Sequence, residues 1–100
     1  MLTLVVSLHI HVGHEANFER YEAEAARIMR RYGGRIERRL CRAAATNDSQ
    51  PDEVHLVTFP DAESFERYRS DGELAALASL RARAIRETTI WSGSDLPPFG

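Results

Sequence analysis

Residues 2–12, LTLVVSLHIHV, alternate strictly between two kinds of position. Every even position holds leucine, isoleucine or valine, whereas the odd positions hold threonine, valine, serine and two histidines. A period of two is the signature of a β-strand, because successive side chains point to opposite faces of the sheet. The stretch therefore predicts a first strand with one apolar, buried face and one mixed face that carries His9 and His11.

The period changes in the next segment, where apolar residues recur at spacings of three and four. This stripe predicts an amphipathic helix of about five turns, whose opposite, charged face includes Glu22 and should be exposed to solvent. Gly33 and Gly34 should end the helix, because glycine adopts the left-handed conformation of a C-cap without steric cost. The stripe consists of Phe18, Tyr21, Ala25, Ile28, Met29 and Tyr32.

The rest of the chain predicts three more strands and two more helical segments. They are a strand at 35–44, a turn-rich loop at 45–52, a strand at 53–59, a helix at 61–69, a helix restarting at Ser70 and reaching residue 85, and a strand at 87–92. Asp61 is a good N-cap, and Ser70 with Glu73 has capping-box spacing. This βαββαβ order is the ferredoxin-like plan, an α+β fold in which helices cover one face of a four-stranded antiparallel sheet. We expect a single domain, 1–93, and a C-terminal tail, 94–100.

Composition excludes several classes of protein. One hundred residues, 43% hydrophobic and 28% charged, indicate one small globular domain. No apolar run approaches the ~20 residues of a membrane-spanning helix, and no secretory signal is evident. A single cysteine, Cys41, excludes an internal disulfide and fits a cytoplasmic location. The net charge of −2 and the lack of paired aromatics on the first and third predicted strands argue against a nucleic-acid partner.

The mixed face of the sheet bears on assembly. Val5 lies on this face beside Thr3, Ser7 and His9, a combination that suits neither open solvent nor a dry core. A second copy packed sheet against sheet would cover the face and leave room for a pocket. A hundred-residue domain also has only a small core of its own. We therefore expect a homodimer.

Three stretches carry a resemblance to a known group of proteins: NFERYEAEAARIMRRYGGRI (17–36), PDEVHLVTFPDAESFERYRSD (51–71) and LRARAIRETTIWSG (80–93). They resemble the dimeric α+β barrel superfamily, most closely its small members of unknown function. In those members a tyrosine-rich helix ends in a YGG-like turn, and a strand ending in Phe-Pro, here Phe59-Pro60, leads into a short helix. The resemblance covers residues 2–93. It implies the fold, the dimer, and a pocket between the exposed sheet face and the helices or within the barrel.

The superfamily also includes antibiotic-biosynthesis monooxygenases, haem-degrading enzymes, muconolactone isomerase-like proteins and stress-responsive proteins. Haem degradation fits this sequence poorly, because those relatives place a ligand histidine on a helix and the predicted helices at 61–69 and 71–85 contain none. Trp91 and Asn17 are present, but no surrounding motif ties them to the monooxygenase chemistry.

The candidate catalytic residue is His9, because histidine exchanges protons near neutral pH and this one lies well inside the first strand. Ser7 and His11 share its face and are expected to contact a ligand. His55, near the start of the strand at 53–59, is a further candidate, although the sequence leaves its sheet face open. The alternative is that His9 has no role in catalysis and is a partly buried histidine whose hydrogen bonds are satisfied.

Two more residues are candidate ligand contacts. Trp91 could stack on a flat organic ligand, although a large aromatic residue on a last strand more often belongs to the core or the dimer interface. Arg38 and Arg42 are predicted to share a face with Ile36 and Leu40, so that one of them reaches a pocket rim, where arginine binds carboxylates and phosphates well. Arg38 is the candidate ligand contact. The alternative for the arginine-rich run is an edge strand protected by charge.

Three histidines in six residues, His9, His11 and His14, also raise the question of a metal site. His9 and His11 would lie about 6.5–7 Å apart along one strand. The turn after Val12 should carry His14 away, which leaves an incomplete ligand set that only Glu15 could extend. We expect no metal and no other cofactor, since the chain has neither a glycine-rich phosphate loop nor a cysteine cluster.

Two functions remain open from the sequence. The first is an enzyme that acts on a small, flat organic substrate without a cofactor, as an oxygenase or an isomerase would, with His9 as acid or base. The second is a non-catalytic ligand-binding or stress-related dimer. A usable histidine and an apolar pocket fit both functions.

Overall fold

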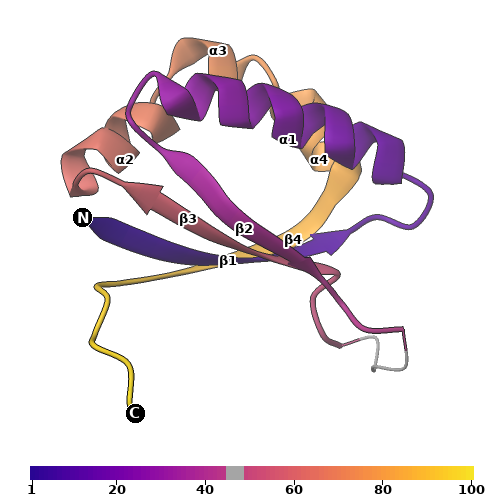
Figure 1. The fold of residues 1–100 in the computed structure, drawn as a ribbon. Helices are drawn as coiled ribbons and strands as arrows, with labels where there is room; N and C mark the ends of the chain where they lie inside the picture. The colour runs from indigo at the N-terminus through magenta and orange to yellow at the C-terminus, as the bar shows by residue number, and fades with distance from the viewer. Residues whose placement is uncertain (45–48) are drawn as a thin grey trace.

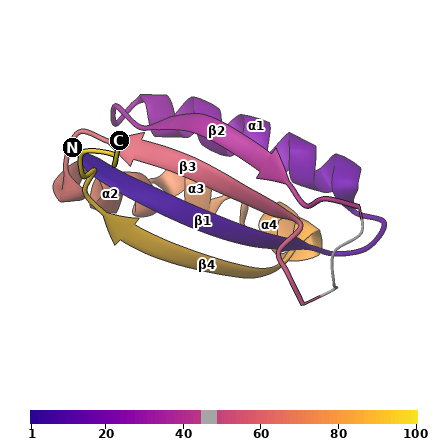
Figure 2. The same cartoon turned by 60° about the horizontal axis from the view of Figure 1, so that its bottom comes forward.

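The computed structural model describes residues 1–44 and 49–100, so part of the predicted loop at 45–52 lies outside the described residues. The strands are β1 (Leu2–Ile10), β2 (Arg35–Cys41), β3 (Glu53–Phe59) and β4 (Ile85–Gly93), and the helices are α1 (Glu15–Arg30), α2 (Ala62–Arg69), α3 (Gly72–Ala75) and α4 (Ala78–Ala84). The sheet has the order β2-β3-β1-β4, and every neighbouring pair is antiparallel. The helices lie together on one side of the sheet (Figure 1), and the strands are seen from the open side in Figure 2. The predicted α+β, ferredoxin-like fold is confirmed.

The alternation of β1 divides its side chains between the two faces as predicted. Leu4 and Leu8 are 2% exposed and belong to the core beneath the helices. Phe18 and Ile28 of α1 pack in the same layer and are equally buried. We call this side of the sheet the helix face and the other side the open face.

The turn after α1 depends on two adjacent glycines. Gly33 has a φ of 75°, which is the left-handed conformation, and the amide of Gly34 donates to the carbonyl of Met29 at 3.0 Å. A Cβ on Gly34 would lie 2.4 Å from Cε1 of Phe59. The predicted glycine stop is therefore correct, and Gly34 also lets the chain pass close to the core.

β1 ends two residues earlier than its alternation predicts. The amide of Ile10 donates to the Asp52 carboxylate at 2.7 Å, and the amide of His11 donates to the carbonyl of Ala84 at 2.9 Å. His11 therefore lies in the turn that leads to α1 rather than on the mixed face of the strand. Its ring centroid is 6.2 Å from that of His14, so the prediction that His14 is carried away from it was wrong.

A β-bulge in β2 changes the face of Arg38. Ile36 pairs with Val57, but Arg38 pairs with Leu56, which leaves Glu37 as the extra residue. Side chains directly opposite in antiparallel strands point to the same face, so Ile36 lies on the helix face and Arg38 on the open face. The prediction that Arg38 and Ile36 share a face was therefore wrong.

The helical segment predicted to restart at Ser70 is two short helices, α3 and α4. Asp71 rather than Ser70 is the N-cap, because its Oδ1 accepts from the amides of Glu73 at 2.8 Å and Leu74 at 3.0 Å. Asp61 caps α2 as predicted and accepts from the amide of Ser64 at 2.8 Å. Neither α2 nor α3 contains a fully buried residue, so apolar packing alone holds this segment weakly.

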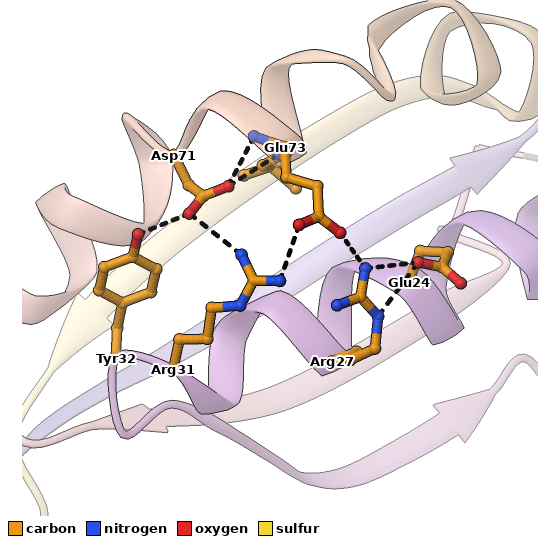
Figure 3. Close-up of polar contacts among 7 residues, drawn as sticks. Glu24, Arg27, Arg31, Tyr32, Asp71 and Glu73 are labelled. Atoms are coloured by element: carbon orange, nitrogen blue, oxygen red, sulfur yellow. Dashed lines mark hydrogen bonds and ion pairs between the residues drawn. The ribbon is translucent and has the colours of Figure 1, made fainter.

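A polar network ties α3 to α1 (Figure 3). Glu73 accepts from Arg27, and from Arg31 at 2.7 Å. Asp71 accepts from the Tyr32 hydroxyl at 2.5 Å and lies 3.7 Å from the Arg31 guanidinium. These contacts lower the pKa of Asp71, with the Tyr32 hydrogen bond as the largest cause. The network compensates for the sparse apolar contacts of α3.

We expect Asp71→Ala to lower the melting temperature by more than Asp61→Ala does. Both changes remove an N-cap, but only Asp71 also contacts α1 through Tyr32 and Arg31. Thermal unfolding followed by circular dichroism measures the difference, and hydrogen exchange should show faster exchange at the Leu74 amide. Equal losses for the two variants would show that the ties to α1 contribute nothing.

Candidate functional site

A cavity of about 390 Å³ lies between the helices and the helix face of the sheet. Its walls are mainly apolar and come from all four strands and all four helices. Its lining residues that stay exposed lie at the end of α2, in α3 and α4, and on β4, which is an edge strand. The cavity therefore opens to solvent between the α3–α4 segment and β4.

His55 is the buried polar residue of this cavity. It pairs with Val6 in the β-sheet, and so its imidazole points to the helix face, where it is 2% exposed. Its Nε2 is 2.9 Å from the Glu53 carboxylate, and its Nδ1 is 4.0 Å from the Glu22 carboxylate. Donation from Nε2 to Glu53 leaves Nδ1 as a proton acceptor on the side of Glu22. This arrangement orients the imidazole for proton transfer.

Arg39 holds Glu53 in place from the neighbouring strand. It donates to both oxygens of Glu53, at 3.0 and 2.8 Å, and to both oxygens of Glu19, at 3.1 and 2.7 Å. The hydrogen bond from Arg39 lowers the pKa of Glu19. A bidentate guanidinium of this kind fixes the carboxylate that in turn fixes His55.

Glu22 is the acidic group of the cavity. Its side chain is 17% exposed, so it is not on a solvated face as the sequence pattern predicted. Burial is the largest cause that raises its pKa, and the nearby Glu53 raises it further, whereas His55, Arg81 and Arg39 act in the opposite direction. A carboxylate with a raised pKa beside a histidine is suited to take up and release a proton.

Two tyrosines complete the polar part of the cavity. Burial raises the pKa of Tyr21 and that of Tyr68, so both hydroxyls stay neutral and available as hydrogen-bond donors. Phe65 and Tyr68 both lie against Phe59, with ring centroids 5.2 and 5.5 Å from that of Phe59. The cavity thus combines an aromatic wall with a few polar groups, as is typical of sites for small organic molecules.

We expect Glu22→Gln to change the pH dependence of stability. Because the pKa of Glu22 is raised from 4.5 in the folded state, its protonated form favours folding. The free energy of unfolding should therefore lose this contribution as the pH rises through the folded-state pKa of Glu22. Urea unfolding of the wild type and the variant from about pH 4 to pH 8 measures this contribution as the difference between their free energies of unfolding at each pH. Glu66→Gln, at an exposed glutamate, is the control, and identical curves for wild type and Glu22→Gln would contradict the burial of Glu22.

The structure separates the residues that the sequence singled out. Ser7 and His9 lie on the open face, and so does Trp91, which pairs with Val5 and is 67% exposed. Arg38 is on the same open face, and His11 is in the turn after β1. Of the predicted site residues, His55 alone lines the cavity. The catalytic role that the sequence suggests for His9 is untested, and the cavity offers His55 as the alternative acid or base.

His9 has two close partners on the open face. Its Nδ1 accepts from Arg86 at 3.1 Å, and its Nε2 is 3.4 Å from the Glu87 carboxylate. The side chain is 12% exposed. Within residues 1–44 and 49–100, no cluster of three or more histidine, cysteine, aspartate or glutamate side chains is placed to hold a metal ion.

Glu22 and Arg81 are cavity residues that the sequence pattern did not reveal. A signal for Glu22 exists, because it follows the buried Phe18 by four residues and therefore lies near the same side of the helix. Arg81 directly follows the buried Leu80, and nothing in the sequence distinguishes it from the other arginines.

The fold is shared with solved structures of several small α+β proteins. A protein of unknown function from Rhodopseudomonas palustris superposes with a TM-score of 0.82 at 13% identity, over 97% of this chain and 83% of that one. A NIPSNAP domain protein from Burkholderia xenovorans gives 0.74 at 17% identity, over 96% and 95%. SnoaB, a cofactor-independent oxygenase from Streptomyces nogalater, gives 0.67 at 19% identity, over 98% and 97%. At these identities the likeness establishes the fold.

The family follows from the sequence itself. A family model described as a domain of unknown function, DUF1330, matches residues 4–93, and the chain belongs to this family. The predicted resemblance to small α+β proteins of unknown function is thereby confirmed. No protein in the comparison with curated proteins matches the chain. Among the described residues, no helix has the length and apolar character needed to cross a membrane.

Proposed function

We propose that the protein binds a small organic molecule in the cavity between the helices and the sheet, and acts on it as a cofactor-independent oxygenase or isomerase. The observation that carries this proposal is the buried His55, held by Glu53 and facing Glu22 inside an apolar cavity. The likeness of the fold to a cofactor-independent oxygenase adds support.

The chemistry that we assign to His55 and Glu22 is proton abstraction. Glu22 or Nδ1 of His55 takes a proton from a carbon or hydroxyl group of the substrate, and the neutral Tyr21 and Tyr68 hydroxyls stabilise the resulting oxyanion. An isomerase returns the proton to another atom of the substrate. An oxygenase lets the electron-rich anion react with O2.

Non-catalytic ligand binding is the second candidate function. Among the described residues, every buried side-chain nitrogen and oxygen has a hydrogen-bond partner. The hydrogen-bonded His55–Glu53–Arg39 network stabilises a fold as well as it serves a reaction. Turnover by the purified protein distinguishes the two functions.

We also propose that the protein is a homodimer, with the open face of the sheet as its interface. Trp91 and Leu40 are exposed on this face, at 67% and 46%, and Trp91 pairs with the partly buried Val5. Trp91 lies against Gly93, where a Cβ would be 2.7 Å from the indole ring. A two-fold axis would place identical apolar patches in contact. Sedimentation equilibrium at low micromolar concentration should give twice the chain mass of 11.3 kDa, and a monomer would overturn the dimer.

The proposed function is tested by oxygen consumption and by product analysis with 1,4-dihydroxynaphthalene, a flat hydroquinone that fits a cavity of about 390 Å³. We expect saturable binding by isothermal titration calorimetry and a rate of O2 uptake or tautomer exchange above the buffer rate. Binding without turnover favours the non-catalytic function. Absence of both would overturn the proposal for this class of ligand.

A further inference from the structure

Arg81 places a positive charge at the edge of the cavity. It belongs to α4, where the neighbouring Leu80 is buried, and its guanidinium donates to the Thr88 hydroxyl at 2.9 Å. Thr88 pairs with Leu8, so its side chain is on the helix face of β4. Both residues line the cavity, and Arg81 is exposed where the cavity meets solvent.

Arg81 differs from the other arginine of the cavity in its partners. Arg69 is 3.3 Å from the Glu66 carboxylate and lies over the Phe65 ring at 5.3 Å. In residues 1–44 and 49–100, by contrast, no carboxylate lies within ion-pair distance of Arg81. A guanidinium that is held in place by a hydroxyl and that none of these described carboxylates pairs with is suited to bind an anion.

The charge of Arg81 acts inside the cavity rather than only at the surface. It lowers the pKa of three groups that line the cavity, namely Glu22, Tyr21 and Tyr68, against the larger opposing effect of burial. An arginine that pointed away into solvent would be screened from these groups. The hydrogen bond to Thr88, whose side chain is on the helix face, holds the guanidinium at the lining of the cavity.

We propose that Arg81 and Thr88 form an anion-binding subsite of the cavity, and that its ligand is a small organic carboxylate with an apolar body. This inference rests on the proposed function and adds the class of substrate. A planar carboxylate fits the planar guanidinium. The adjacent walls, with Phe65, Leu74 and Ile90, are apolar and suit the rest of the molecule. The carboxylate at the edge would hold the body of the ligand towards His55 and Glu22.

The test compares two probes of nearly equal shape, 2-naphthoate and 2-naphthamide, by isothermal titration calorimetry with the full chain. We expect the wild type to bind the acid about ten- to hundredfold more tightly than the neutral amide. Arg81→Gln should lose this preference and still bind the amide as the wild type does. Arg69→Gln is the matched control, because it removes a cavity arginine that already has a carboxylate partner.

Thr88→Val supplies a second variant that keeps the shape of the side chain. It should weaken binding of the acid several-fold and leave binding of the amide unchanged, because only the acid engages the guanidinium that Thr88 orients. Circular dichroism spectra and melting temperatures check that each variant is folded.

The outcomes separate this inference from the proposed function. If the amide binds as tightly as the acid, or if Arg81→Gln retains the preference, the anion subsite is wrong while ligand binding in the cavity stands. If neither probe binds up to about 1 mM, both the subsite and the proposed cavity ligand are overturned. Loss of the preference in Arg69→Gln rather than in Arg81→Gln also overturns the subsite.

Discussion

Replacement of His55 by glutamine is expected to lower the turnover number by about 10²–10⁴-fold, the usual contribution of a general acid or base. The imidazole is held by Glu53 at 2.9 Å and faces Glu22. Its loss therefore removes the proton acceptor that lies beside Glu22. The rate is measured as O2 uptake or as exchange of the substrate proton.

Two further variants, Glu22→Gln and His9→Gln, test whether the reaction takes place in the cavity or on the open face. Glu22→Gln should also lower the rate, because the amide cannot accept a proton. His9→Gln should leave it unchanged, because His9 lies on the open face with Arg86 and Glu87. A large loss in His9→Gln together with near-normal rates in the other two variants would transfer the acid or base role to His9.

The largest expected effect on stability is that of Phe59→Ala, which should lower the free energy of unfolding by about 3–5 kcal/mol. Phe59 is 1% exposed and packs against Phe65 and Tyr68, with ring centroids 5.2 and 5.5 Å away. Its ring also occupies the space that a side chain at Gly34 would need. The truncation therefore leaves a hole that these neighbours fill only in part.

Urea unfolding at constant pH measures this loss, and Phe99→Ala is the matched control. Phe99 lies in the C-terminal segment and is fully exposed, so the same truncation there should change stability by less than about 0.5 kcal/mol. Similar small effects for both variants would contradict the assignment of Phe59 to the core.

The fold was predictable because its main signals are local. Strict alternation over residues 2–10 defines the helix face of β1, and the Gly33-Gly34 stop follows from the needs of a helix C-terminus. The first strand's end was not predictable, since it depends on hydrogen bonds to Asp52 and Ala84, which are distant in sequence. The Asp71 cap was missed because the Ser70–Glu73 spacing suggested a start one residue earlier.

The candidate site was less predictable because it depends on pairing between strands. His55 was identified as a candidate, but its face is set by the register that places it opposite Val6. The bulge at Glu37 reverses the face of Arg38 relative to Ile36, and a bulge of this kind leaves no periodic signal in seven residues of strand. Glu22 was assigned to solvent because a charged residue at the border of a helix stripe is usually exposed.

A crystal structure of the wild-type protein with 2-naphthoate tests most directly whether the space between the helices and the sheet is the functional site. We predict the naphthalene ring inside this cavity, close to His55 and Glu22, with the carboxylate on Arg81. A ligand bound instead on the open face beside His9 and Trp91, with the cavity empty, would contradict the account.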